Sequence, residues 1–103
     1  MNDDLIRGSS ILVVDDNPAN LGILYQFLSR AGYRVLASQD GESALDMAVR
    51  EKPDLILMDV MLPGEDGFSV CRKLQEIEGT DQIPVIFVTA LTQVEDKLTG
   101  FDA

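Results

Sequence analysis

The sequence predicts an α/β fold in which a parallel sheet is covered on both faces by helices. Short apolar runs rich in β-branched residues alternate with stretches whose apolar residues recur at helical spacing. This alternation is typical of right-handed crossovers between parallel strands, with helices above and below the sheet. At 103 residues the chain forms one domain at most and is long enough to bury a core.

The first strand and the first helix are expected at residues 11–14 and 18–31. The run Ile-Leu-Val-Val is typical of a buried strand, and Asn17-Pro18 marks a turn and a helix start. Gly32 is suited to end the helix as the residue after its cap. The residues expected to face inward are Leu21, Leu24, Leu28 and Ala31.

The later elements follow from the same patterns. Further strands are expected over residues 33–38, 55–58 and 84–88. The strand at residues 55–58 is apolar throughout, which suits burial on both faces of the sheet. A second helix ends before Pro53, a third starts near Gly67, and a fourth follows the last strand. Their expected inward residues are Ala44, Leu45, Ala48 and Val49, then Val70, Leu74 and Ile77, then Val94, Leu98 and Phe101.

The charge, the cysteine content and the apolar runs of the chain limit its expected partners and its expected compartment. The chain carries 8 basic and 18 acidic residues, a net charge of −10, which argues against nucleic acid or an anionic membrane as a direct partner. Cys71 is the single cysteine, so no internal disulfide can form, and a reducing cytoplasm is the expected compartment. No apolar run is long enough to span a membrane. Residues 1–9 are polar and are expected to form a leader, not a signal peptide.

Polar residues stand where three of the predicted strands end. Asp15 and Asp16 follow the first strand, Asp59 the third and Thr89 the fourth. The carboxyl ends of parallel strands share one edge of the sheet, which is where ligands bind in open α/β folds. If the first and third strands are neighbours, three carboxylates converge and repel one another unless a cation lies among them. Mg²⁺ prefers such oxygen ligands, with a backbone carbonyl from the loop after Asp59 as a further one.

An aspartate beside Mg²⁺ can react with a phosphoryl group. The cation would offset the repulsion between carboxylate and phosphate, and attack by the carboxylate would give an acyl phosphate. Asp59 is the expected nucleophile, because a buried strand carries it to its tip and Pro63, Gly64 and Gly67 then force a loop. The Thr89 hydroxyl is suited to bind a phosphate oxygen, and the small Ala90 leaves room for it.

These stretches resemble the receiver domain of bacterial two-component response regulators. The resemblance rests on ILVVDDNPAN, DLILMDVMLPGEDGF and PVIFVTA, and it extends over nearly all of the chain. It implies a three-layer, flavodoxin-like fold with strand order 2-1-3-4, in which the chain acts as a phosphoacceptor signalling domain and not as an enzyme. A histidine kinase or a phosphotransfer protein would load Asp59, and an output domain or downstream partner would respond to the resulting change of conformation.

The resemblance also assigns roles to single residues. Asp16 would ligate Mg²⁺ directly, together with Asp59, and Asp15 would do so largely through water. The backbone carbonyl of Met61 would be the third protein ligand. Thr89 would be the switch hydroxyl that moves onto the phosphoryl group, with Ala90 leaving access to it. Met61 and Leu91 resemble positions that tune how long the phosphoryl group survives.

The chain departs from the family pattern at its end. Receiver domains carry a fifth strand, a fifth helix and a lysine further along than Ala103, and Lys97 within EDKLTGF does not replace that lysine. Residues 10–103 are therefore expected to be a receiver domain truncated before strand five and helix five. We expect the uncovered apolar surface to favour a homodimer.

Other interpretations remain open at this stage. Asp15 and Asp16 could serve only as a helix cap, and Asp59 could be a lone acid at a strand end. An aspartyl phosphatase of the haloacid dehalogenase kind also fits a strand-end aspartate with Mg²⁺, but it needs an acid where Met61 stands. An FMN carrier would need a loop of Ser, Thr and Gly in place of the acidic DDNPAN. A receiver that is never phosphorylated and serves only in protein contacts is the last alternative.

Overall fold

The computed structural model describes residues 9–62, 64 and 66–88. The predicted fourth helix and the predicted roles of Thr89 and Ala90 lie outside these residues, as do Leu91 and Lys97. Residues 1–8 of the predicted leader also lie outside the described residues. The described elements, in chain order, are β1 (Ser10–Val14), α2 (Pro18–Arg30), β2 (Arg34–Ser38), α3 (Gly41–Glu51), β3 (Leu55–Asp59), α4 (Gly67–Glu76) and β4 (Val85–Val88).

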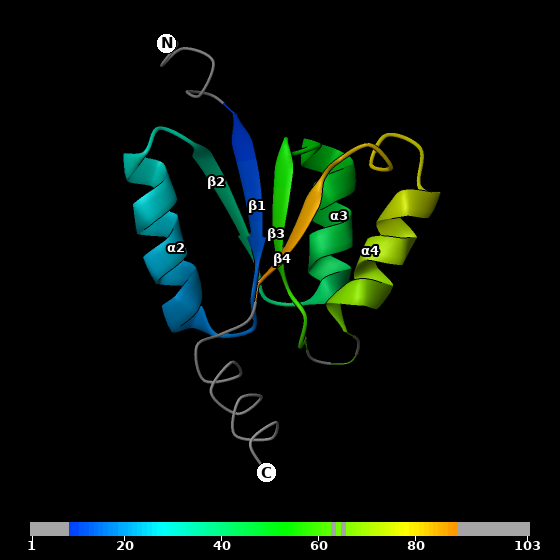
Figure 1. The fold of residues 1–103 in the computed structure, drawn as a ribbon, viewed down its shortest axis with the longest axis horizontal. Helices are drawn as coiled ribbons and strands as arrows, with labels where there is room; N and C mark the ends of the chain where they lie inside the picture. Colours follow the sequence, from blue (N-terminus) through cyan, green and yellow to red (C-terminus); the bar gives the residue numbers. More distant parts are fainter. Residues whose placement is uncertain (1–8, 63, 65, 89–103) are drawn as a thin grey trace, which may run out of the picture.

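The described strands form one parallel sheet in the order β2-β1-β3-β4. Helix α2 covers one face of the sheet, and α3 and α4 cover the other, so the domain has three layers (Figure 1). The predicted fold class and strand order are confirmed. No helix among the described residues is both long and apolar enough to cross a bilayer.

Two apolar cores lie on opposite faces of the sheet. Alternate residues of β1 point to opposite sides, so Leu12 and Val14 pack with α3 and α4, whereas Ile11 and Val13 pack with α2. Every residue of β1 is buried, as expected for a central strand covered on both faces. Met58 on β3 is also fully buried. Apolar packing on both faces of the sheet therefore holds β1 and β3 side by side.

A side-chain cap begins each described helix. Asn17 Oδ1 accepts a hydrogen bond from the Ala19 backbone N–H at 2.8 Å, and Pro18 occupies the first helical position of α2. Asp40 and Asp66 cap α3 and α4 in the same way. Gly32 has a positive φ of 102° just past α2, as its predicted terminating role requires.

The inward faces of the helices differ from prediction at three positions. Val49 is 41% exposed, and Met47 packs on the core instead. The buried Ala44 and Ala48 define the centre of the inward face of α3, and Val49 lies about 100° beyond Ala48 around the helix. The two other predicted residues lie past the helix ends: Ala31 is the exposed C-cap of α2, and Ile77 is the half-buried C-cap of α4.

Candidate metal centre

The register of the central strands brings three carboxylates together. Val14 pairs with Met58 across β1 and β3, so the next residues, Asp15 just past β1 and Asp59 at the last position of β3, lie side by side at this edge of the sheet. Asp16 follows directly, and one oxygen from each of these aspartates lies within 4.8 Å of the others. Asp59 is fully buried and Asp15 is 3% exposed, whereas Asp16 is exposed to solvent. The convergence predicted from the strand ends is confirmed.

The two carboxylate oxygens of Asp59 have different surroundings. Oδ1 accepts a hydrogen bond from the Met61 backbone N–H at 3.1 Å. Oδ2 is buried and has no hydrogen-bond partner among the described residues. An unsatisfied buried acceptor costs on the order of 1–3 kcal/mol, so such an atom calls for an explanation.

The surroundings of Asp59 raise its pKa. Desolvation by burial is the largest cause, and the neighbouring charges of Asp15 and Asp16 add to it. The hydrogen bonds from the backbone N–H groups of Met61 and Val60 act in the opposite direction. The net effect disfavours the charged carboxylate when the acids stand alone, and a bound cation would reverse that preference.

Asp15, in contrast, has a donor for each of its oxygens. The backbone N–H of Asn17 donates to Oδ1 at 2.9 Å, and the side-chain amide of Asn20 donates to Oδ2 at 3.3 Å. Its own backbone N–H donates to the Ser38 carbonyl on β2 at 3.1 Å. Asp15 is therefore held in place by Asn17 before α2, by Asn20 on α2 and by Ser38 on β2.

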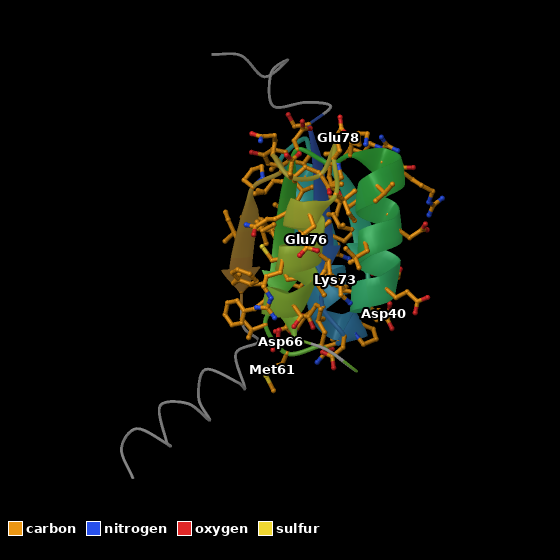
Figure 2. The ribbon with its side chains drawn as sticks, turned by 90° about the vertical axis from the view of Figure 1, so that its right-hand side faces the viewer. Asp40, Met61, Asp66, Lys73, Glu76 and Glu78 are labelled. Atoms are coloured by element: carbon orange, nitrogen blue, oxygen red, sulfur yellow. The ribbon has the colours of Figure 1, made fainter. Side chains whose placement is uncertain are left out.

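The loop after β3 folds back onto the strand end. Met61 and Asp66 form an isolated antiparallel bridge, and Figure 2 shows the two residues side by side at one end of the molecule. The Gly67 N–H donates to the Val60 carbonyl at 2.7 Å. A Cβ at Gly67 would overlap the Asp59 carbonyl oxygen and lie 2.9 Å from Met58 Cγ. Only glycine allows this close return of the chain.

The donor set fits a hard divalent cation such as Mg²⁺. The side-chain atoms that converge are carboxylate oxygens, and Asp59 also carries the buried, unpartnered Oδ2. Around an octahedral ion with ligands at about 2.1 Å, the ligand atoms lie about 3–4 Å apart. Separations of up to 4.8 Å suit two direct carboxylate ligands, with the third acting through water.

Sequence reasoning missed two residues of this site. In the sequence, Asn20 stands out only as part of the DDNPAN stretch, and Gly67 only as a loop and helix-start residue. The signal for Asn20 is that the first turn of α2 has an amide and no acidic residue, although acidic residues are favoured at the start of a helix. For Gly67 the sequence offers the Asp-Gly pair, but the contact with Asp59 depends on how the loop returns.

Comparison with known proteins settles the family. Residues 11–103 match the family described as the response regulator receiver domain. The chain belongs to this family. Its sequence is 48% identical over 93 residues to the response regulator PleD of Caulobacter vibrioides, covering 90% of the chain and 20% of PleD. It is 46% identical to the DNA-binding dual master transcriptional regulator RpaA of Synechocystis, covering 90% of the chain and 39% of RpaA.

Solved receiver domains have the same fold. The receiver domain of the sensor histidine kinase PA1611 from Pseudomonas aeruginosa has a TM-score of 0.77 and 38% identity, covering 88% of this chain and 75% of that one. That structure contains a magnesium ion coordinated in its active site cleft. The chemotaxis response regulator CheY4 of Vibrio cholerae has a TM-score of 0.77 and 28% identity, covering 92% and 79%. The receiver domain described here spans well under half the length of PleD and RpaA.

Proposed function

We propose that this receiver domain accepts a phosphoryl group on Asp59 in a Mg²⁺-dependent reaction. The donor is a histidine kinase or a phosphotransfer protein, and the phosphorylated domain signals through a change of conformation. The observation that carries the proposal is the buried, unpartnered Oδ2 of Asp59 among three converging carboxylates. A purely structural aspartate would have its buried oxygens satisfied.

The chain's own residues prepare the nucleophile. The Met61 N–H holds Oδ1, which fixes the carboxylate and leaves Oδ2 to form the bond to phosphorus. As the oxygen–phosphorus bond forms, the phosphorus–nitrogen bond of a phosphohistidine donor breaks, and the imidazole, which already carries a proton on its other ring nitrogen, leaves as a neutral group that keeps the electron pair of the broken bond. Thr89 is proposed to bind the transferred group through its hydroxyl, with Ala90 leaving it room.

Asp16, Asp59 and the Met61 carbonyl are the proposed direct metal ligands, with Asp15 acting through water. In extended backbone the N–H and carbonyl of one residue point to the same side, and the Met61 N–H points at Asp59. Bound Mg²⁺ supplies positive charge that lets a carboxylate approach a phosphoryl group. The magnesium ion in the related PA1611 receiver supports this assignment.

The partners are proposed from the same resemblance. RpaA is described as a DNA-binding transcriptional regulator, and this chain matches 39% of it, so the phosphorylated domain is proposed to act on an output domain or a downstream protein. Direct nucleic-acid binding by this domain is disfavoured by its net charge of −10. The cytoplasm is the proposed compartment.

Self-association stays a separate prediction. β4 is an edge strand of the described sheet, and its Ile86 is 51% exposed. Light scattering over a range of concentrations should give a mass that rises toward that of a dimer. A monomer mass at all concentrations would contradict the predicted homodimer.

Chemical phosphorylation tests the proposal. The purified protein is treated with acetyl phosphate and Mg²⁺, and the modified residue is identified by mass spectrometry after borohydride trapping. Label at Asp59 that disappears with EDTA is expected. Label at another residue, or equal label without a divalent cation, would show that the proposed function is wrong.

The aspartyl phosphatase alternative finds no support in the site. That chemistry needs a proton-transferring acid two residues after the nucleophile. The residue there is Met61, whose thioether cannot transfer a proton and whose side chain is 56% exposed.

A further inference from the structure

The first turn of α2 contains an unusual choice of residue. In a helix with a capping box, an acidic or amide side chain three residues after the cap reaches back to accept the cap's backbone N–H. Asn17 is the cap of α2, and Asn20 stands at that third position. Here the Asn17 N–H donates instead to Asp15 Oδ1 at 2.9 Å. Asp15 thus takes the place of the capping-box acid, and Asn20 is released from that role.

The Asn20 side chain instead faces the acidic cluster formed by Asp15, Asp16 and Asp59. Its side-chain amide donates to Asp15 Oδ2 at 3.3 Å, and an amide that faces a carboxylate must present its NH₂ group. A glutamate or aspartate at this position would add a fourth negative charge next to Asp15, Asp16 and Asp59. A neutral donor binds Asp15 without adding charge.

We propose that Asn20 is a positioning residue for the cation. With Asn17 and Asn20 on its two oxygens, Asp15 is held so that its remaining lone pairs are directed toward the space it shares with Asp59 and Asp16. Partners that orient metal ligands in this way typically affect metal affinity by about 10–100-fold. This inference rests on the proposed function, because it assumes that the three carboxylates bind Mg²⁺.

A merely structural role of Asn20 predicts a different result. Asparagine is a weaker helix former than alanine or leucine, so replacing it should leave the helix at least as stable. If Asn20 serves only the helix, Asn20→Ala and Asn20→Leu change neither metal binding nor the orientation of Asp15. Leucine branches at Cγ as asparagine does, so Asn20→Leu removes the donor while leaving a γ-branched side chain at this position.

The test is a titration of Mg²⁺ by isothermal calorimetry at constant ionic strength, with unfolding temperatures measured in EDTA. We expect Asn20→Ala and Asn20→Leu to raise the Kd for Mg²⁺ about 10-fold. Gln26→Ala and Gln26→Leu are matched controls, since Gln26 is an exposed amide on the same helix, and their Kd should equal that of the wild type.

The outcomes separate the two proposals. If the wild type binds Mg²⁺ and both Asn20 variants bind equally well, the positioning role is wrong and the proposed function stands. If the wild type does not bind Mg²⁺, both are wrong. If the two Asn20 variants weaken binding while they remain folded in EDTA at the temperature of the titration, the positioning role is supported. A loss of Mg²⁺ affinity that also occurs in the Gln26 variants would contradict it.

Discussion

Asp54 and Asp59 stand at opposite ends of the same strand and have opposite surroundings. Asp54 lies at the amino end of β3, where Oδ2 accepts hydrogen bonds from the Ser10 backbone N–H at 2.8 Å and from the Ser10 hydroxyl at 3.5 Å. Asp59, at the carboxyl end, has a buried Oδ2 without a partner among the described residues. The first carboxylate joins β3 to β1. The second is the carboxylate that we propose accepts a phosphoryl group.

This contrast shows how one residue type serves either stability or chemistry. Asp54 is exposed, and Ser10 donates to its Oδ2 from both the backbone and the hydroxyl, so it leaves no buried acceptor unsatisfied. Asp59 has a buried oxygen without a partner among the described residues and two like charges nearby, and burial raises its pKa. Perturbed acids that also lack partners are typical of functional sites.

The largest expected effect is on phosphorylation. Asp59→Asn should reduce labelling by acetyl phosphate to background, because the amide is not a nucleophile. Asp54→Asn is the matched control: it keeps an acceptor for Ser10 and should be labelled like the wild type. Intact-mass spectrometry measures both. Equal loss of label in the two variants would contradict the different roles assigned to Asp54 and Asp59.

Gly67 tests whether the loop must return so closely to Asp59. Gly67→Ala places a methyl group against the Asp59 carbonyl oxygen and should destabilise the protein by about 2 kcal/mol, as overpacking does. It should also weaken Mg²⁺ binding by displacing the loop that carries Met61. Gly22→Ala on α2 is the control, because no atom lies within 4 Å of the added carbon, and it should stabilise by about 0.5–1 kcal/mol. Urea unfolding compares the two; equal stability would contradict the account of Gly67.

The raised pKa of Asp59 predicts a dependence of stability on pH. The folded state holds the Asp59 proton more tightly than the unfolded state does, so the contribution of Asp59 to stability falls as pH rises from 3.8 through the raised pKa. Asp59→Asn should therefore be more stable than the wild type at neutral pH without metal, and this advantage should vanish below about pH 3.8.

Mg²⁺ should offset this loss in the wild type. A free concentration ten times the Kd stabilises a protein by about 1.4 kcal/mol when only the folded state binds. Thermal unfolding with Mg²⁺ and with EDTA at neutral pH measures the effect, and Asp59→Asn should respond less. A wild type that gains nothing from Mg²⁺, or an equal gain in the variant, would contradict the prediction.

The smallest effect is expected at Asp66, the cap of α4. The backbone N–H of Ser69 donates to its carboxylate at 2.8 Å and is the main cause of its lowered pKa. Its contribution to stability is present above pH 3.8 and is lost as pH falls through the lowered pKa. Asp66→Ala should lower the unfolding temperature slightly at neutral pH and less in acid. A difference that is independent of pH would exclude the charge as its source.

The sequence predicts the sheet well because strong local patterns specify it. Buried runs that end in acids indicate β1 and β3, and the register then brings Asp15 to Asp59. The inward face of α3 is less predictable, because alanines at its centre leave the flanking positions of Met47 and Val49 undetermined by hydrophobicity alone.

Hydrogen-bond partners are beyond what the sequence can predict here. Asp54 and Asp59 are both aspartates beside an apolar run, and only the folded chain shows that Ser10 satisfies one of them. The contact of Asn20 with Asp15 depends on the geometry of the first turn of α2. The fit of Gly67 against Asp59 depends on the path of a loop.

The most direct test of the account is a crystal structure with Mn²⁺ in place of Mg²⁺, located by its anomalous scattering. We predict one ion about 2.2 Å from carboxylate oxygens of both Asp16 and Asp59, with its remaining positions taken by the Met61 carbonyl and water. An ion bound elsewhere, or Asp16 and Asp59 directed away from each other with no shared ion, would contradict it.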